Sequence, residues 1–273
     1  MHDLSSTPQS GAGLYGKLPA HGDFLSRNLS PEFVQGWDDW LQRSVASSQE
    51  QLGGRWLDLY LTSPLWRFAL SPGVIDSNVW VGVMMPSVDK VGRYFPLTLA
   101  VPYPQSTSPV ELMVSGESVF RELEQIALSG LDEHGSVESV NQALESIPPI
   151  QLSGIATKSV ALDFSRPIAL QMEKAEQNPL LSHPFLLDCF LQQRLPSYSL
   201  WWSTGSEYVT PSFLVSGHLP PAQMFVAMLD GQWQQWSWNS PFGVIPQNEQ
   251  LIPVPDSAGD DESTVINEEQ MND

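Results

Sequence analysis

Three apolar runs, close together in the first half of the chain, constrain the fold most. They are LWRFAL at 65–70, VWVGVMM at 79–85 and YFPLTLAV at 94–101, and short links rich in turn-forming residues join them. Parallel strands need a crossover of a dozen or more residues, whereas antiparallel neighbours need only a short link. The spacing therefore predicts antiparallel strands at the centre of a sheet.

The clearest helix signal lies between Ser30-Pro31 and Gly53-Gly54. Ser30 is a typical N-cap, Pro31 suits the first turn, and the glycines mark the end. Further helices are expected at 55–61, 116–130, 136–146, 184–195 (capped by Ser182) and 221–229. Further strands are expected at 14–18, around 158–172, and at 199–202 and 211–217.

Together these elements predict an α/β fold, a three-layer α-β-α sandwich around a mixed, largely antiparallel sheet. We expect one domain from residue 13 to 255, preceded by a loose leader at 1–12. The segment 256–273 carries seven acids and no basic residue, a composition typical of a disordered, solvated tail.

Composition excludes several classes of function. The chain holds 31 acidic and 12 basic residues, a formal net charge of −19, so it lacks the clustered Lys and Arg of a nucleic-acid surface. Anionic membranes would repel it, and the sequence shows neither a signal peptide nor an apolar run long enough to insert directly into a bilayer. Cys189 is the one cysteine, so no internal disulfide can form. These features predict a cytoplasmic protein and leave its oligomeric state open.

The opening stretch GAGLYGKLPAHGDF, at 11–24, contains parts of two phosphate-binding templates. A dinucleotide fingerprint needs a strand before its first glycine and a helix at its last, but polar residues precede Gly11, and Pro19 and Gly22 follow. A Walker loop needs Ser or Thr after its lysine, and here Lys17 is followed by Leu18. Neither template is complete, so we expect no nucleotide here.

No other catalytic or metal-binding pattern is complete. Ser87 and Lys90 match S-x-x-K, but the K-T-G partner motif is missing. The five histidines are widely scattered, so a metal cluster would have to assemble entirely through the fold. We therefore expect no cofactor and no metal.

Five motifs occur in order within the first hundred residues. They are GKLPAHGDFLSRNL, WDDWL, a Trp56/Tyr60 pair, SPLWRF and MPSVDKVGRYFPL. Taken together they resemble the TagF family, also called ImpM, of proteins associated with bacterial type VI secretion. The resemblance is strongest from Gly13 to Pro102 and continues more weakly through SLWWSTG and LPPAQMF.

This resemblance implies a cytoplasmic, non-enzymatic accessory protein that represses secretion-system assembly after translation. The expected partner is the forkhead-associated scaffold protein of the apparatus, bound through a surface rimmed by the basic half of the fold. The family has no established catalytic residues, so none is carried over.

Charged and polar residues within these motifs are the candidate site. Either they form one internal polar network that ties loop to loop, or they line a groove that receives a partner, because an unpaired ion in a core is costly. The candidates are Lys17, His21, Asp23, Arg27, Asp38, Arg67, Ser87, Asp89 and Arg93. The alternative function is an enzyme, or a protein that binds a small molecule or phosphate, with Ser87 or His21 in the active role. It would use the cluster of Lys17, His21, Asp23, Ser87, Asp89 and Arg93.

Overall fold

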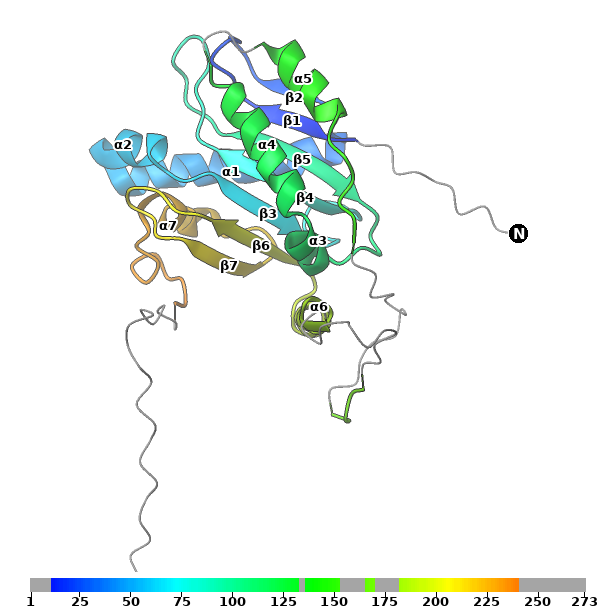
Figure 1. Cartoon of the computed structure of the whole chain (residues 1–273). Helices are drawn as coiled ribbons and strands as arrows, with labels where there is room; N and C mark the ends of the chain where they lie inside the picture. The colour runs from blue at the N-terminus through cyan, green and yellow to red at the C-terminus, as the bar shows by residue number, and fades with distance from the viewer. Residues whose placement is uncertain (1–10, 133–135, 153–164, 170–181, 241–273) are drawn as a thin grey trace, which may run out of the picture. The chain divides into compact units, whose positions relative to one another are not determined.

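The computed structural model describes residues 11–132, 136–152, 165–169 and 182–240. Its centre is a seven-stranded sheet with the order β2-β1-β5-β4-β3-β6-β7 (Figure 1). The strands are β1 (Gly13–Gly16), β2 (Leu25–Arg27), β3 (Trp66–Leu70), β4 (Val79–Met85), β5 (Leu97–Tyr103), β6 (Tyr198–Ser203) and β7 (Ser212–Gly217).

The three apolar runs are β3, β4 and β5, and they pair as antiparallel neighbours, as predicted. Gly82 of β4 lies between Phe68 of β3 and Ala100 of β5. The sheet was expected to be mixed and largely antiparallel. Every strand pairing among the described residues is antiparallel, so this part of the chain contains no parallel pair.

Both faces of the sheet are buried, which explains why β4 is apolar throughout and why β3 is apolar except for the ion-paired Arg67. The helices are α1 (Pro31–Leu52), α2 (Trp56–Leu61), α3 (Pro109–Ser115), α4 (Glu117–Ser129), α5 (Val137–Glu145), α6 (His183–Arg194) and α7 (Ala227–Asp230), with 3₁₀ turns at Gly53–Arg55 and Ala222–Met224. Phe68 joins the apolar cluster that contains the α1 side chains, and its neighbour Ala69 joins the cluster that contains the α4 side chains. Helices thus pack on both faces.

Helix α1 forms as its sequence predicts. The Ser30 hydroxyl accepts a hydrogen bond from the Phe33 amide at 3.1 Å, and Gly53 ends the helix with a φ of 51°. Trp37 is fully buried, and its ring centroid lies 4.8 Å from that of Phe68. Aromatic burial therefore fixes α1 against the sheet.

Several local expectations differ from the structure. The short strand β2 and the helix α3 were not expected; α3 begins at Pro109 after Ser108, whose hydroxyl caps it. The expected helix at 221–229 is a 3₁₀ turn followed by α7, which ends at the left-handed Gly231. Ser182 starts α6 without a side-chain cap, because its own backbone is helical.

Some expectations fall on residues outside the described ranges. They include most of the leader, the acidic tail and nearly all of the strands expected around 158–172; the described residues 165–169 are turn and irregular backbone. Within the described part of the chain, no helix combines the length and the apolar character needed to cross a bilayer.

Candidate functional site

The glycines of the opening stretch lie on a strand and in the segments on either side of it, without the strand–loop–helix order of a phosphate loop. Residues Gly13–Gly16 form β1, which pairs with β2 and β5, and the first helix does not begin until Pro31. Gly16 has a φ of +129°, and a Cβ there would lie 2.1 Å from the Pro96 carbonyl oxygen. The positive φ and the close approach of the Pro96 carbonyl are sufficient reason for a glycine at this position.

Asp89, in the link between β4 and β5, is the centre of a buried ionic cluster. Its side chain is 0% exposed. One carboxylate oxygen, Oδ2, accepts from Lys17 Nζ at 2.9 Å and from Arg93 Nε at 2.7 Å. The other, Oδ1, accepts from the backbone amides of Val91 at 3.0 Å and Arg93 at 2.8 Å.

These four donors keep Asp89 ionised. Burial by itself raises the pKa of the carboxyl, but the hydrogen bonds from Arg93, Lys17 and Val91 outweigh it and hold the pKa well below its usual range. The carboxylate is therefore a permanent anion at neutral pH, suited to holding loops together and unsuited to exchanging protons.

The same cluster ties the loop after β1 to the loop after β4. Arg93 Nη2 donates to the Gly22 carbonyl at 2.6 Å, and the Ser87 hydroxyl donates to the Lys17 carbonyl at 2.7 Å. The Lys90 amide donates to the His21 carbonyl at 3.0 Å. Lys17, Ser87, Asp89 and Arg93 thus form one bonded network, whereas His21 joins it through its backbone.

Tyr60 of α2 contacts this network through two hydrogen bonds to the Ser87 backbone. Its hydroxyl donates to the Ser87 carbonyl and accepts from the Ser87 amide, each at 3.0 Å. The tyrosine is 1% exposed and Ser87 is 3% exposed. Because the Ser87 hydroxyl is buried and donates its proton to a carbonyl, the arrangement does not present it as a nucleophile.

Two of the predicted residues lie on the surface outside the network. Asp23 is exposed, and its Oδ1 accepts from the Phe24 amide at 2.8 Å. Arg27 is exposed and donates from Nη1 to the Ser26 carbonyl at 2.8 Å. Both bonds are local, so the fold does not bring these residues to Asp89.

Two others belong to separate contacts. Asp38 of α1 accepts from the Tyr15 hydroxyl at 2.5 Å. Arg67 of β3 donates from Nε and Nη2 to Glu124, at 2.6 and 2.8 Å, and from Nη1 to Glu117 at 2.6 Å. These acids lie on α4, so Arg67 links the sheet to that helix in a forked ion pair.

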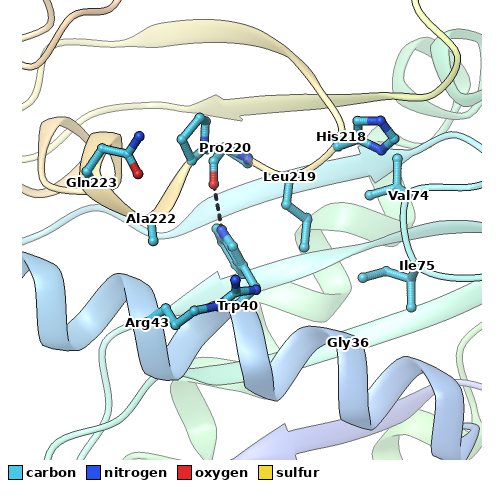
Figure 2. Close-up of a pocket in the computed structure, with 11 residues that line it drawn as sticks. Gly36, Trp40, Arg43, Val74, Ile75, His218, Leu219, Pro220, Ala222 and Gln223 are labelled. Carbon is cyan, nitrogen blue, oxygen red and sulfur yellow. Dashed lines mark hydrogen bonds between the residues drawn. The ribbon is translucent and has the colours of Figure 1, made fainter.

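The sequence reasoning missed a groove between α1 and the segment that follows β7. Its volume is about 560 Å³, and Figure 2 shows Trp40 rising from α1 to Pro220, with Arg43 beside it along the same helix. The lining residues are Gly36, Trp40, Arg43, Val74, Ile75, His218, Leu219, Pro220, Pro221, Ala222 and Gln223. The signal that could have pointed to it is the unusual Leu219-Pro220-Pro221 sequence, because consecutive prolines keep a segment extended.

Hydrogen bonds hold the walls of this groove. Trp40 Nε1 donates to the Pro220 carbonyl at 2.7 Å, and Gln51 donates to the Gln223 carbonyl at 3.0 Å. Arg43 is exposed and donates from Nε to the Asp39 carbonyl at 2.9 Å. The described residues contain no group of three or more His, Cys, Asp or Glu that could hold a metal ion.

Comparison with known proteins identifies the family to which this antiparallel α/β fold belongs. Residues 13–147 match the model of the TagF N-terminal domain, described as type VI secretion system-associated. The crystal structure of PA0076 from Pseudomonas aeruginosa PAO1 matches with a TM-score of 0.68 and 35% identity, over 88% of this chain and 100% of that one. The chain therefore belongs to the TagF family. Among curated proteins, none matches it.

Proposed function

We propose that this protein is a cytoplasmic, non-enzymatic repressor of a type VI secretion system, acting after translation by binding the forkhead-associated scaffold protein of the apparatus. The observation that carries the proposal is the family match over residues 13–147, together with the 35% identical structural relative. The family is associated with this secretion system. Repression after translation, the cytoplasmic location, the lack of catalysis and binding to the scaffold protein are what we add to that association.

The contacts of the polar cluster support a role without catalysis. Lys17 and Arg93 both pair with the carboxylate of Asp89, and the Ser87 hydroxyl donates to the Lys17 carbonyl. A nucleophile needs an adjacent base, and a phosphate site needs donors that are not already used. The described contacts of this cluster therefore favour the stabilisation of two loops over the enzyme or phosphate-binding alternative.

The direct test has two parts. The purified full-length chain is titrated against the purified scaffold protein by isothermal calorimetry, and effector secretion is measured in cells that overproduce the chain. We expect saturable binding and a loss of secretion that leaves the scaffold protein's abundance unchanged. Normal secretion together with no measurable heat of binding contradicts the proposal.

The alternative has its own test. Thermal unfolding is measured with nucleotides and inorganic phosphate at millimolar concentration. We expect no change in the midpoint, because the cations near Asp89 are already paired. A clear increase that disappears in Lys17→Met would favour the phosphate-binding function instead.

A further inference from the structure

The groove between α1 and residues 218–223 differs in charge from the rest of the protein. Among its lining residues are one arginine and one histidine, Arg43 and His218, and no Asp or Glu. The whole chain has 31 acids against 12 basic residues. A cavity without an acid is therefore a local exception, and its charge suits a negatively charged group.

Arg43 is placed to bind such a group. It is exposed, and its Nε is used by the Asp39 carbonyl, a backbone bond that holds the side chain along the helix. Its Nη1 and Nη2 make no hydrogen bond or ion pair with any described residue. A guanidinium with two free nitrogens binds a carboxylate well, because the planar fork matches the two oxygens.

The rest of the lining is largely apolar. Val74, Ile75, Leu219 and Pro220 form walls that accept hydrophobic side chains. The volume of about 560 Å³ is within the roughly 300–1,000 Å³ of pockets that bury a drug-sized ligand. It can therefore hold a few side chains of a peptide, but not a folded domain.

Hydrogen bonds within the chain fix one end of the groove. His218, at one end in Figure 2, has a φ of 58°, a region that side chains rarely adopt. Three bonds hold it there: its amide donates to the Ser197 carbonyl at 3.2 Å, its carbonyl accepts from the Ser199 hydroxyl at 2.6 Å, and its Nδ1 lies 2.6 Å from Ser197 Oγ. Strained residues fixed in this way are typical of binding sites, and preformed walls lower the entropy cost of binding.

Gly36 keeps the groove open. It lies within α1, where glycine is unfavourable, and its φ is not positive. A Cβ at this position would meet only Ile75 side-chain atoms, at 3.5 and 3.6 Å, which is ordinary contact. Packing therefore does not require a glycine here. Because Gly36 has no side chain, the volume that a side chain would fill is part of the groove.

We propose that this groove is where the protein receives its partner, and that the occupant is a short extended segment of that partner with a carboxylate beside apolar side chains. The carboxylate binds Arg43, and the apolar side chains pack against Ile75 and Leu219. The inference rests on the proposed function, since it names the face that binds the scaffold protein. The loops around Asp89 are a weaker candidate, because Lys17 and Arg93 already bind that acid.

The test compares the affinity of the scaffold protein for the full-length chain and three variants, measured by isothermal calorimetry. Arg43→Glu reverses the charge in the groove, and Gly36→Leu fills it. Arg55→Glu is the matched control, because Arg55 is also exposed, lies outside the groove and changes the net charge equally. Circular dichroism checks that all of them fold.

We expect Arg43→Glu and Gly36→Leu each to weaken binding by about tenfold or more, the size of a hot-spot loss, while Arg55→Glu stays within about twofold. If the wild type binds and the two groove variants bind equally well, the groove inference is wrong and the proposed function stands. If the wild type does not bind, the proposed function fails, and this inference fails with it.

A crosslinking experiment identifies the occupant. A photoreactive amino acid replaces Gln223, an exposed residue of the lining, and the crosslinked peptide of the scaffold protein is identified by mass spectrometry. We expect a segment with Asp or Glu next to apolar residues. A crosslink to a basic or wholly polar segment would overturn the proposed chemistry even if the groove variants weaken binding.

Discussion

Replacing Gly36 by alanine should stabilise the protein, although this residue lines the groove. The residue lies inside the 22-residue helix α1. The added methyl would lie 3.5 Å from Ile75 Cγ2 and 3.6 Å from Cδ1, within ordinary van der Waals contact. Nothing in the described structure therefore has to move.

The magnitude follows from helix propensity. Glycine costs a helix interior about 0.5–1 kcal/mol relative to alanine, so Gly36→Ala should raise the free energy of unfolding by about that much. For a chain of this size the midpoint of thermal unfolding should rise by about 1–4 °C. Urea denaturation followed by circular dichroism measures the free energy, and the slope with urea should not change.

Gly82→Ala is the opposing control. In β4, a Cβ at this position would lie 2.1 Å from the Leu99 carbonyl oxygen and 2.6 Å from Phe68 Cζ. Forcing atoms into a packed core costs about 1–3 kcal/mol, occasionally more, so this variant should unfold at lower urea. A loss of stability in Gly36→Ala would refute the reasoning, since it would mean that α1 requires the glycine for packing.

The polar network gives three further predictions. Tyr60→Phe removes the acceptor of the buried Ser87 amide and should lower the free energy of unfolding by about 1–3 kcal/mol. The control Tyr94→Phe should change it little, because the Tyr94 hydroxyl makes no hydrogen bond with the described residues. Urea denaturation of both variants measures the difference. Asp89→Asn should destabilise the protein more than Lys17→Met. The first change leaves buried Lys17 without the only acid that it contacts in the described structure, whereas the second leaves Asp89 with three other donors. Equal losses in the free energy of unfolding would contradict this asymmetry. The folded pKa of Asp89 is lowered, so its contribution to stability is present above the unfolded pKa of about 3.9 and is lost as pH falls through the folded pKa. The difference in stability between the wild type and Asp89→Asn should therefore shrink below about pH 4. Acid titrations of both proteins measure this difference.

Local signals in the sequence were sufficient for the central elements. The short links between three apolar runs predicted β3, β4 and β5 as antiparallel neighbours, and Ser30-Pro31 predicted the start of α1. These signals work because strand direction and helix capping depend on residues close together in the chain. The three-residue strand β2 was missed, because so short an element has no hydrophobic period to detect.

The candidate site was only partly predictable, because its contacts join distant residues. Lys17 and Asp89 are 72 positions apart, and nothing in the spacing shows that they meet while Asp23 and Arg27 remain on the surface. The motifs identified residues that matter to the fold, but they did not distinguish a network member from a surface neighbour.

The sequence by itself determined the family, the antiparallel centre of the sheet and the absence of a complete phosphate-binding template. Only the tertiary structure decided that Asp89 pairs with both Lys17 and Arg93, and that Arg43 of α1 and His218 beyond β7 line one groove. The physical reason is that capping, turns and hydrophobic periodicity act over a few residues, whereas the pairing of buried charges and the shape of a cavity depend on how the helices and strands pack together.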